Sequence, residues 1–294
     1  MKKVLVQVVS NSLGDTIACS PYVSEYQKKN NFEIIFSVND PYIPLLEKSY
    51  TNLNIVGRND NVSFDEKINL EYIFHKSIQG GYAEQLGFEN PIYIRPVITV
   101  PDLPRPIKNK YVSMGVHSTC QLKYWNHPNG LKSQGDSLNW NELSGILRKR
   151  GYTPVVVEKD EMYGTPPFFN GIPSKSNKQI GKTLQEAVNI IKHSEFYIGL
   201  SSGMSWVAHA LGKKVVMISN FTEDWNEFDL SLDDYIRITN KSVCHGCWNK
   251  ISIEHSFDKN DWYWCPLHKN TERQFECHKS ITVDDVMKKI EPWL

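Results

Sequence analysis

Short runs of β-branched and apolar residues alternate along this chain with longer segments of helical character, and this alternation limits the folds that are open to it. The first part of the chain has the expected order strand, helix, strand, helix, strand, at 2–9, 16–29, 32–38, 43–50 and 53–57. Units of this length are typical of a parallel sheet covered by helices. The next segment, 68–88, is expected to be largely helical, with a break at Gly80 and Gly81.

A proline-rich stretch then interrupts the pattern. Five prolines fall within the sixteen residues from Pro91 to Pro106, and proline at this density disfavours a helix and stiffens an extended chain. We therefore predict a domain boundary here, with one domain over 1–106 and a second over 107–294. Two β-rich pieces inside the stretch, at 92–94 and 97–100, are candidates for edge strand.

The second half of the chain repeats the alternation of strand and helix. Thr183 and Glu186 have the spacing of a capping box at the start of a helix over 183–194. The predicted fold class is therefore α/β, with two Rossmann-like domains. Many nucleotide-sugar enzymes have this architecture, but so do binding proteins and kinases, so the fold alone does not assign a function. The strands expected in this half are 110–118, 152–158, 195–200 and 213–219.

The composition excludes some partners. The chain has 33 basic and 33 acidic residues, and such a balance gives no general attraction to nucleic acid or to a membrane surface. No stretch approaches the ~18 apolar residues of a membrane span, and the apolar run near the start is too short for a signal sequence. We expect a cytoplasmic protein, in which free thiols and metal thiolates are favoured over disulfides.

The loop after the strand 195–200 is a candidate phosphate site. It runs from Ser201 through Ser202 and Gly203 to Met204, where a helix begins. Helix N-termini present free N–H groups to an anion, glycine permits a close approach of the backbone, and serine adds a hydroxyl donor. The alternative is that Ser201 or Ser202 only caps the helix. Ligands of open α/β sheets bind beyond the carboxyl ends of strands, which favours the site.

A second polar loop follows the strand 110–118. Ser118 and Thr119 are candidates for contacts with phosphate, and Lys123 is a candidate for neutralising its charge. The alternative for Lys123 is an ordinary solvated surface lysine. Two such loops in one domain indicate a bound nucleotide more strongly than either loop does alone.

Asp15 lies in the corresponding turn of the first domain, within NSLGDTIACSP. A carboxylate at the end of the first strand can serve as a general base toward a ligand across a cleft. The alternative is that Asp15 caps a helix that starts at Thr16. The sequence leaves both open.

Four of the six cysteines lie in the last fifty-one residues. Cys244 and Cys247 form a C-x2-C pair around Gly246, and Cys265 and Cys277 follow. Four thiolates suit a closed tetrahedral site for zinc or iron, with a structural role. We therefore predict one metal ion within the segment 240–280, which has little aliphatic periodicity of its own. Disulfides and buried thiols are the alternatives, and the second choice of ligands is the nearby histidines His245, His255, His268 and His278.

Several of these stretches resemble a known family. LGD, with Pro21 six residues after Asp15, resembles the start of lipopolysaccharide heptosyltransferases, and the segment from Thr183 to Lys213 resembles their donor-binding region. QLKYWNHPNG, SSGMSWVAHALGKKVVMIS, FTEDWNEF and CHGCW with the later cysteines resemble autotransporter-protein heptosyltransferases over roughly residues 112–294.

This resemblance implies a GT-B glycosyltransferase, with a cleft between its two domains and inversion of the anomeric centre. It also implies ADP-heptose as the sugar donor, a protein or glycan hydroxyl as the acceptor, and iron rather than zinc on the four cysteines. Alternatives are a degenerate GT-B protein that binds nucleotide without turnover and a metal-tailed binding module. Monomer and homo-oligomer are both open.

Overall fold

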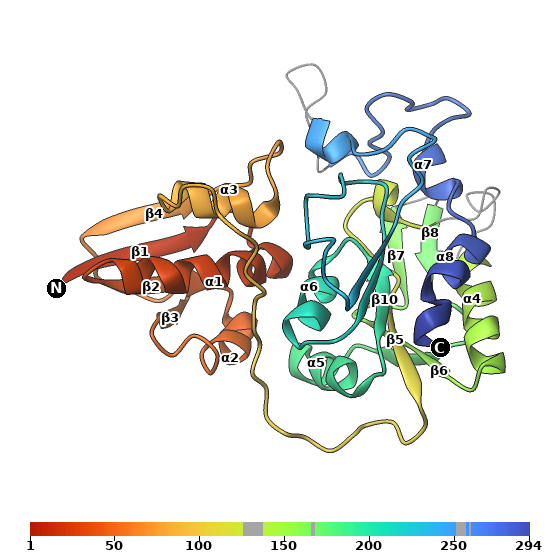
Figure 1. Ribbon diagram of the computed structural model, residues 1–294, viewed down its shortest axis with the longest axis horizontal. Helices are drawn as coiled ribbons and strands as arrows, with labels where there is room; N and C mark the ends of the chain where they lie inside the picture. Colours follow the sequence, from red (N-terminus) through yellow and green to blue (C-terminus); the bar gives the residue numbers. More distant parts are fainter. Residues whose placement is uncertain (126–137, 166–167, 251–256, 259) are drawn as a thin grey trace.

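The structure is a computed structural model that describes residues 1–125, 138–165, 168–250, 257–258 and 260–294. Two parallel sheets stand apart from each other, with helices packed between and around them (Figure 1). The N-terminal strands form one sheet, and the C-terminal half of the chain forms the other. This arrangement agrees with the predicted α/β class.

The first sheet has the strand order β3-β2-β1-β4, and all of its neighbouring strands are parallel. Its strands are β1 (Lys2–Val8), β2 (Phe32–Val38), β3 (Asn54–Gly57) and β4 (Glu66–Leu70). The accompanying helices are α1 (Leu13–Lys29), α2 (Ile43–Leu46) and α3 (Ile78–Gln85).

The second sheet has the order β12-β11-β10-β5-β6-β9 and is also parallel. Its strands are β5 (Tyr111–Gly115), β6 (Thr153–Glu158), β9 (Asn177–Ile180), β10 (Tyr197–Leu200), β11 (Val215–Ile218) and β12 (Tyr235–Ile238). Its helices are α4 (Leu138–Lys149), α5 (Leu184–His193), α6 (Gly203–Ala210), α7 (Glu276–Lys279) and α8 (Val283–Ile290). A separate antiparallel hairpin joins β7 (Met162–Thr165) to β8 (Phe168–Gly171). The predicted capping box at Thr183 and Glu186 is present at the start of α5.

The prediction for 68–88 is wrong in part. The strand β4 occupies the start of this segment and pairs with β1, and α3 is only eight residues long. Gly80 and Gly81 lie inside α3 and do not break it. A Cβ on Gly81 would stand 3.2 Å from the side chain of Ile73, so glycine permits close packing against the preceding loop.

The proline-rich stretch runs as an extended segment between the two sheets (Figure 1). The expected edge strands at 92–94 and 97–100 are absent from this described segment. Its backbone is instead bonded to helices, because the Ile98 amide donates to the Ala210 carbonyl at 3.0 Å and the Ile94 amide donates to Gln79 Oε1 at 3.0 Å. These bonds attach the stretch to α6 on one side and α3 on the other.

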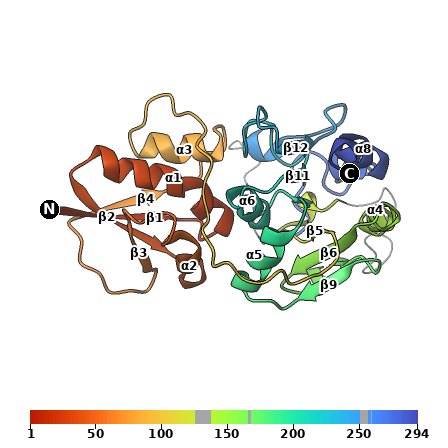
Figure 2. The ribbon, with the colours of Figure 1, turned by 60° about the horizontal axis from the view of Figure 1, so that its bottom comes forward.

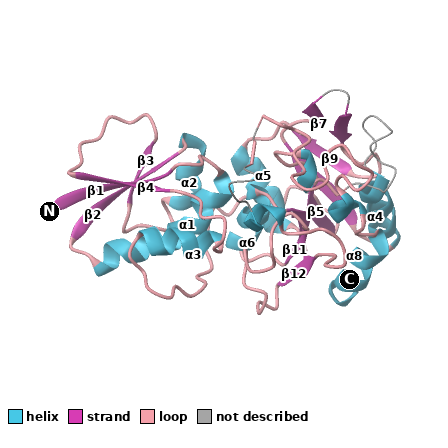
Figure 3. Ribbon diagram, turned by 90° about the horizontal axis from the view of Figure 1, so that it is seen from above, coloured by secondary structure: helices cyan, strands magenta, loops and turns pink. Residues whose placement is uncertain are grey.

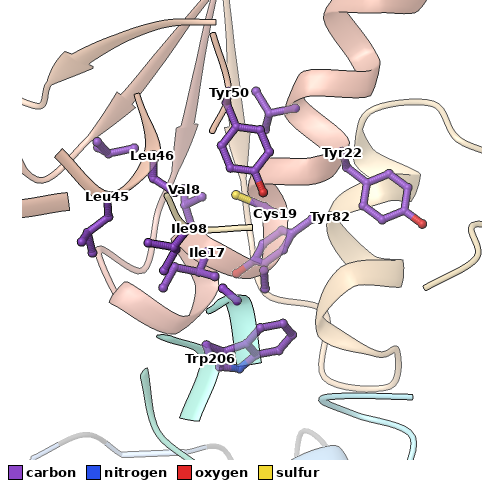
Figure 4. Close-up of a cluster of buried hydrophobic side chains, with 14 of the residues drawn as sticks. Val8, Ile17, Cys19, Tyr22, Leu45, Leu46, Tyr50, Tyr82, Ile98 and Trp206 are labelled. Carbon is purple, nitrogen blue, oxygen red and sulfur yellow. The ribbon is translucent and has the colours of Figure 1, made fainter. Parts of the chain in front are cut away.

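Helices α1 and α6 lie between the two sheets (Figures 2 and 3). The core of the first sheet extends across this contact, since Trp206 of α6 packs with Ile17 and Tyr82 of the first sheet's helices (Figure 4). Trp206 is buried to 3% exposure. The two halves therefore share apolar packing. Across the described part of the chain, none of the helices combines the length and apolar character needed to cross a membrane.

Candidate active site in the cleft between the sheets

A cleft of about 530 Å³ lies between the two halves of the molecule. Side chains from both halves line it, and they come from the turns that follow parallel strands. All eight residues predicted for catalysis and donor binding are among them: Asp15, Ser118, Thr119, Lys123, Ser201, Ser202, Gly203 and Met204. The structure thus brings together loops that are nearly two hundred residues apart along the chain, 15 to 204.

Two helix N-termini meet at the floor of this cleft. A Cβ on Gly14 of α1 would stand 3.3 Å from the Gly203 Cα, and a Cβ on Gly203 of α6 would stand 3.2 Å from the Gly14 amide nitrogen. Both distances are tighter than most Cβ contacts, so a larger residue at either position would require the facing helix to shift by a few tenths of an ångström. Gly203 therefore brings α6 against α1, in addition to opening the backbone toward the cleft.

Asp15 does not cap its helix. Helix α1 begins at Leu13, and Ser12 is the N-cap, whose hydroxyl accepts the amide hydrogen of Asp15 at 3.1 Å. The interpretation of Asp15 as the cap of a helix starting at Thr16 is wrong. The Asp15 carboxylate instead faces outward into the cleft region, where Ser10 Oγ donates to its Oδ2 at 2.5 Å.

The loop before α6 divides the roles of its two serines. Ser202 is the N-cap of α6, and its side chain makes no capping bond, so its hydroxyl is not used by the helix. The Ser201 hydroxyl donates to the buried carboxylate of Glu227, which contradicts the expectation that Ser201 offers its proton to a ligand. Arg237 completes this network with a 2.5 Å ion pair to Glu227. The Glu227–Arg237 ion pair thereby fixes the position of the loop before α6.

The loop after β5 is closed by Tyr124. Its hydroxyl donates to the Ser118 carbonyl and accepts from the Ser118 amide, both at 3.0 Å. Thr119 is exposed and Lys123 is partly exposed. The Lys123 ammonium lies 4.8 Å from the ring centre of Phe221, an arrangement in which the ring face attracts the cation. Lys123 therefore lies in the lining of the cleft, with its ammonium against the ring of Phe221.

Glu158 is a cleft residue that the sequence analysis missed. Its Oε1 accepts the amide hydrogens of Val116 at 2.6 Å and His117 at 2.8 Å. Burial raises the pKa of Glu158 to about 8, against the opposing effect of these two amides. Burial likewise lowers the pKa of His117 to about 4. The available signal was position, because Glu158 ends a predicted strand just as Asp15 follows one.

The four cysteines of the C-terminal segment surround a separate small cavity of about 10 Å³. Cys247, Cys265 and Cys277 are buried, Cys244 is partly exposed, and none is in a disulfide. Gly246 has φ of 65°, the left-handed conformation that lets the C-x2-C turn close. Burial and the neighbouring cysteines raise the pKa of Cys247 well above its ordinary value. Four thiols in one confined space fit a cation that would stabilise their ionised forms.

The potential ligand atoms that converge in this structure belong to a different set. Among the described residues, Cys244, His268 and Glu276 have potential ligand atoms that all lie within 4.8 Å of one another, whereas the sulfur atoms of the four cysteines do not form such a group. Glu276 also accepts the amide hydrogen of Cys244 at 3.2 Å. His278 is buried beside the cysteines: its Nε2 accepts from the Asn220 amide at 3.3 Å, and its Nδ1 lies 3.3 Å from Cys277 Sγ. His255 lies outside the described residues.

Solved structures share this fold. The chain matches the Escherichia coli ADP-heptose lipopolysaccharide heptosyltransferase II with a TM-score of 0.60, covering 100% of this chain and 98% of that one. That likeness, at 12% identity, concerns the fold alone. The crystal structure of the iron-containing dodecameric glycosyltransferase TibC from enterotoxigenic E. coli H10407 matches with a TM-score of 0.87 and 29% identity, over 100% of this chain and 77% of TibC. The class is therefore a glycosyltransferase of the GT-B type.

No protein-family model matches the chain, but curated relatives do. The autotransporter heptosyltransferase TibC of E. coli O78:H11 (strain H10407) is 31% identical over 307 residues, which cover 98% of this chain and 71% of TibC. The autotransporter heptosyltransferase Aah of E. coli is 33% identical over 296 residues, or 96% of this chain and 71% of Aah. The chain belongs to the autotransporter heptosyltransferase family.

Two further matches bear on what the site does. TibC has also been solved in complex with ADP-D-β-D-heptose, and this chain matches that structure with a TM-score of 0.87 at 29% identity, over 99% of this chain and 76% of that one. The inactive autotransporter heptosyltransferase BimC of Burkholderia thailandensis is 27% identical over 314 residues, covering 98% of this chain and 68% of BimC.

Proposed function

We propose that this protein is an inverting glycosyltransferase that transfers heptose from ADP-heptose to a hydroxyl group of a protein or glycan. The observation that carries the proposal is the single cleft in which Asp15 from one half of the chain faces the α6 N-terminus and Lys123 from the other. The complex of TibC with ADP-D-β-D-heptose supports the choice of donor.

The donor's diphosphate is assigned to the α6 N-terminus. Its free amide groups and the hydroxyl of Ser202, which makes no capping bond, are suited to phosphate oxygens, and Lys123 supplies the opposing charge. Ser118, Thr119 and Met204 complete the predicted donor surface. As the bond from the anomeric carbon to the diphosphate breaks, these groups stabilise the negative charge that grows on the leaving ADP.

Asp15 is the proposed general base. The acceptor hydroxyl attacks the anomeric carbon from the face opposite the diphosphate, and its proton passes to the Asp15 carboxylate as the new glycosidic bond forms. The hydrogen bond from Ser10 to Oδ2 leaves Oδ1 available for that proton. The N-cap function belongs to Ser12, so the carboxylate is free for this role.

The substitution Asp15→Asn tests the proposal. Because Ser12 caps α1, the variant is expected to fold normally and to bind ADP as the parent does, whereas ADP release from ADP-heptose in the presence of hydroxyl-bearing peptides and oligosaccharides falls by at least about a hundredfold. Asp40→Asn, an exposed carboxylate outside the cleft, is the matched control and keeps parental turnover. Near-parental turnover of Asp15→Asn would remove this residue from the mechanism.

A nucleotide-binding protein without turnover is the second candidate, and it is kept because BimC is an inactive relative. It predicts that the parent protein itself binds ADP-heptose but releases no ADP. The same assay therefore separates the two candidates.

We further infer that one structural metal ion, iron or zinc, is held by Cys244, Cys247, Cys265 and Cys277. The four thiols around one small cavity support this, and so does the iron-containing crystal structure of the relative TibC. When bound, the ion supplies charge stabilisation to the thiolates and links segments that share few aliphatic contacts.

The remaining parts of the proposal concern organisation and location. We assign residues 1–106 to an acceptor-side domain and 107–294 to a donor domain that includes the segment 240–280. Six free thiols fit a reducing compartment such as the cytoplasm. Dodecameric TibC supports a homo-oligomer, and a solution mass equal to one chain of 33.9 kDa would contradict it.

A further inference from the structure

The cysteine segment reaches into the cleft. Directly after Cys247, the 3₁₀ turn Cys247–Lys250 presents Trp248, whose partly exposed side chain lines the cleft. Its ring centre lies 5.4 Å from that of Tyr72 and 4.9 Å from that of Phe74. Tyr72 and Phe74 belong to the loop between β4 and α3, so these contacts join the cysteine segment to the opposite half of the molecule.

Asn249 fastens the same junction. Its side-chain amide donates to the Phe74 carbonyl at 2.7 Å, and its Oδ1 accepts from the Glu223 amide at 2.7 Å. The side chain is buried, at 8% exposure for the residue. Two short hydrogen bonds at a buried site leave the neighbouring Trp248 little freedom to move away from Phe74.

The aromatic wall formed by Tyr72, Phe74, Phe221 and Trp248 spans the cleft between the two reactive ends. At one end, the ring centre of Phe221 lies 4.9 Å from that of Trp248. The Lys123 ammonium lies over the same Phe221 ring, 4.8 Å from its centre. At the other end burial raises the pKa of Tyr72, with smaller contributions from the charges of Glu227 and Asp15. Tyr72 and the proposed base Asp15 line the same cleft.

The chemistry of the reaction determines which part of the substrates lies along this aromatic wall. The ring of the transferred sugar lies between the departing diphosphate and the base that deprotonates the acceptor. Its C–H-rich faces are apolar, and apolar and aromatic side chains are the usual lining of ligand pockets. Because three of the four wall residues are only partly buried, their ring surfaces are open to such a ligand.

We propose that Trp248 binds the ring of the transferred sugar, and that Asn249 is a positioning residue that holds Trp248 against the loop of the other domain. The C-terminal cysteine segment is then part of the sugar subsite as well as a structural element. This inference rests on the proposed function, because it requires a sugar nucleotide in the cleft.

The test compares ADP with ADP-heptose as titrants in calorimetry. Trp248→Leu is expected to weaken ADP-heptose binding by about tenfold, as for loss of an aromatic anchor, and to leave ADP binding within about twofold of the parent, since ADP lacks the sugar. Trp225→Leu is the matched control, because Trp225 is 47% exposed and lies outside the lining of this cleft. Both of its affinities stay parental.

Phe74→Leu repeats the test from the other side of the wall, far from the cysteines in sequence, and guards against loss of metal in the Trp248 variant. Asn249→Asp keeps the acceptor for the Glu223 amide but loses the donor to Phe74. It is expected to lower the ratio of ADP-heptose to ADP affinity while metal content stays parental, which a merely structural residue would not do.

The outcomes separate this inference from the proposed function. A parent protein that binds neither titrant overturns both. A parent that binds both, with Trp248→Leu and Phe74→Leu variants that bind ADP-heptose as tightly as it does, overturns the sugar subsite alone.

Discussion

Glu158 illustrates how a single buried carboxyl group makes the free energy of unfolding depend on pH. Its pKa of about 8 in the folded protein stands above the ordinary 4.5, so the folded state holds a proton that the unfolded state releases. Between about pH 4.5 and 8, rising pH therefore lowers the free energy of unfolding, and above that range the loss is complete.

Replacing Glu158 by Gln is expected to remove this dependence. Glutamine retains an acceptor oxygen for the amides of Val116 and His117 and never ionises. The melting temperature of Glu158→Gln should therefore rise relative to the parent between pH 5 and pH 8.5, with denaturation followed by circular dichroism. Glu142→Gln, on the exposed face of α4, is the control. A constant difference between Glu158→Gln and the parent across this range would contradict the assignment.

The individual site residues were predictable to different degrees. Asp15 and Ser202 follow strands, and the rule that ligands bind beyond the carboxyl ends of parallel strands was enough to find them. Glu227 and Trp248 were missed, because they lie in loops whose place beside the cleft depends on the packing of the whole second half. The involvement of Ser201 with Glu227 could not be read from the chain either, since the partners are 26 residues apart.

At the scale of elements, long apolar runs were the reliable signal. Strands such as β1 and β10 are buried, and their apolar composition predicted them. The helices α1 and α5 were predicted from the polar residues that flank them. β4 was missed because its sequence, EKINL, is polar at alternate positions and continues into a stretch with helical composition. β12 and α8 were not predicted, since they follow the loop-rich part of the chain, where composition gives little guidance.

The proposed metal ion makes the stability of the cysteine segment depend on a ligand from outside the chain. Cys265→Ser is expected to reduce metal content from about one equivalent to less than about a tenth and to lower the melting temperature, because three thiolates do not complete the site. Elemental analysis of freshly purified protein measures the first effect, and calorimetry the second.

His268→Ala is the informative companion, since His268 belongs to the alternative ligand group with Cys244 and Glu276. The four-cysteine assignment expects this variant to keep its metal. Loss of metal in His268→Ala together with retention in Cys265→Ser would show that the alternative group is the site.

At the scale of the whole molecule, the two halves are held together by contacts between them. Gly14 and Gly203 allow α1 and α6 to touch, and Trp206 extends the first core across the junction. A close helix contact of this kind places the two N-termini, and hence the proposed base and the proposed phosphate site, on one cleft. The sequence predicted two α/β halves, but it contained no signal for the face on which they meet.

The central claim is that a nucleotide-diphosphate sugar binds in this cleft with its diphosphate between α6 and Lys123. Calorimetric titration of ADP-heptose into the parent and Lys123→Ala proteins tests it most directly, with Lys149→Ala of the exposed α4 surface as the control. Loss of a charged hydrogen bond predicts that Lys123→Ala binds more weakly by ~1.5–3 kcal/mol, while Lys149→Ala binds as the parent does. Equal affinity of Lys123→Ala and the parent for ADP-heptose would contradict the account.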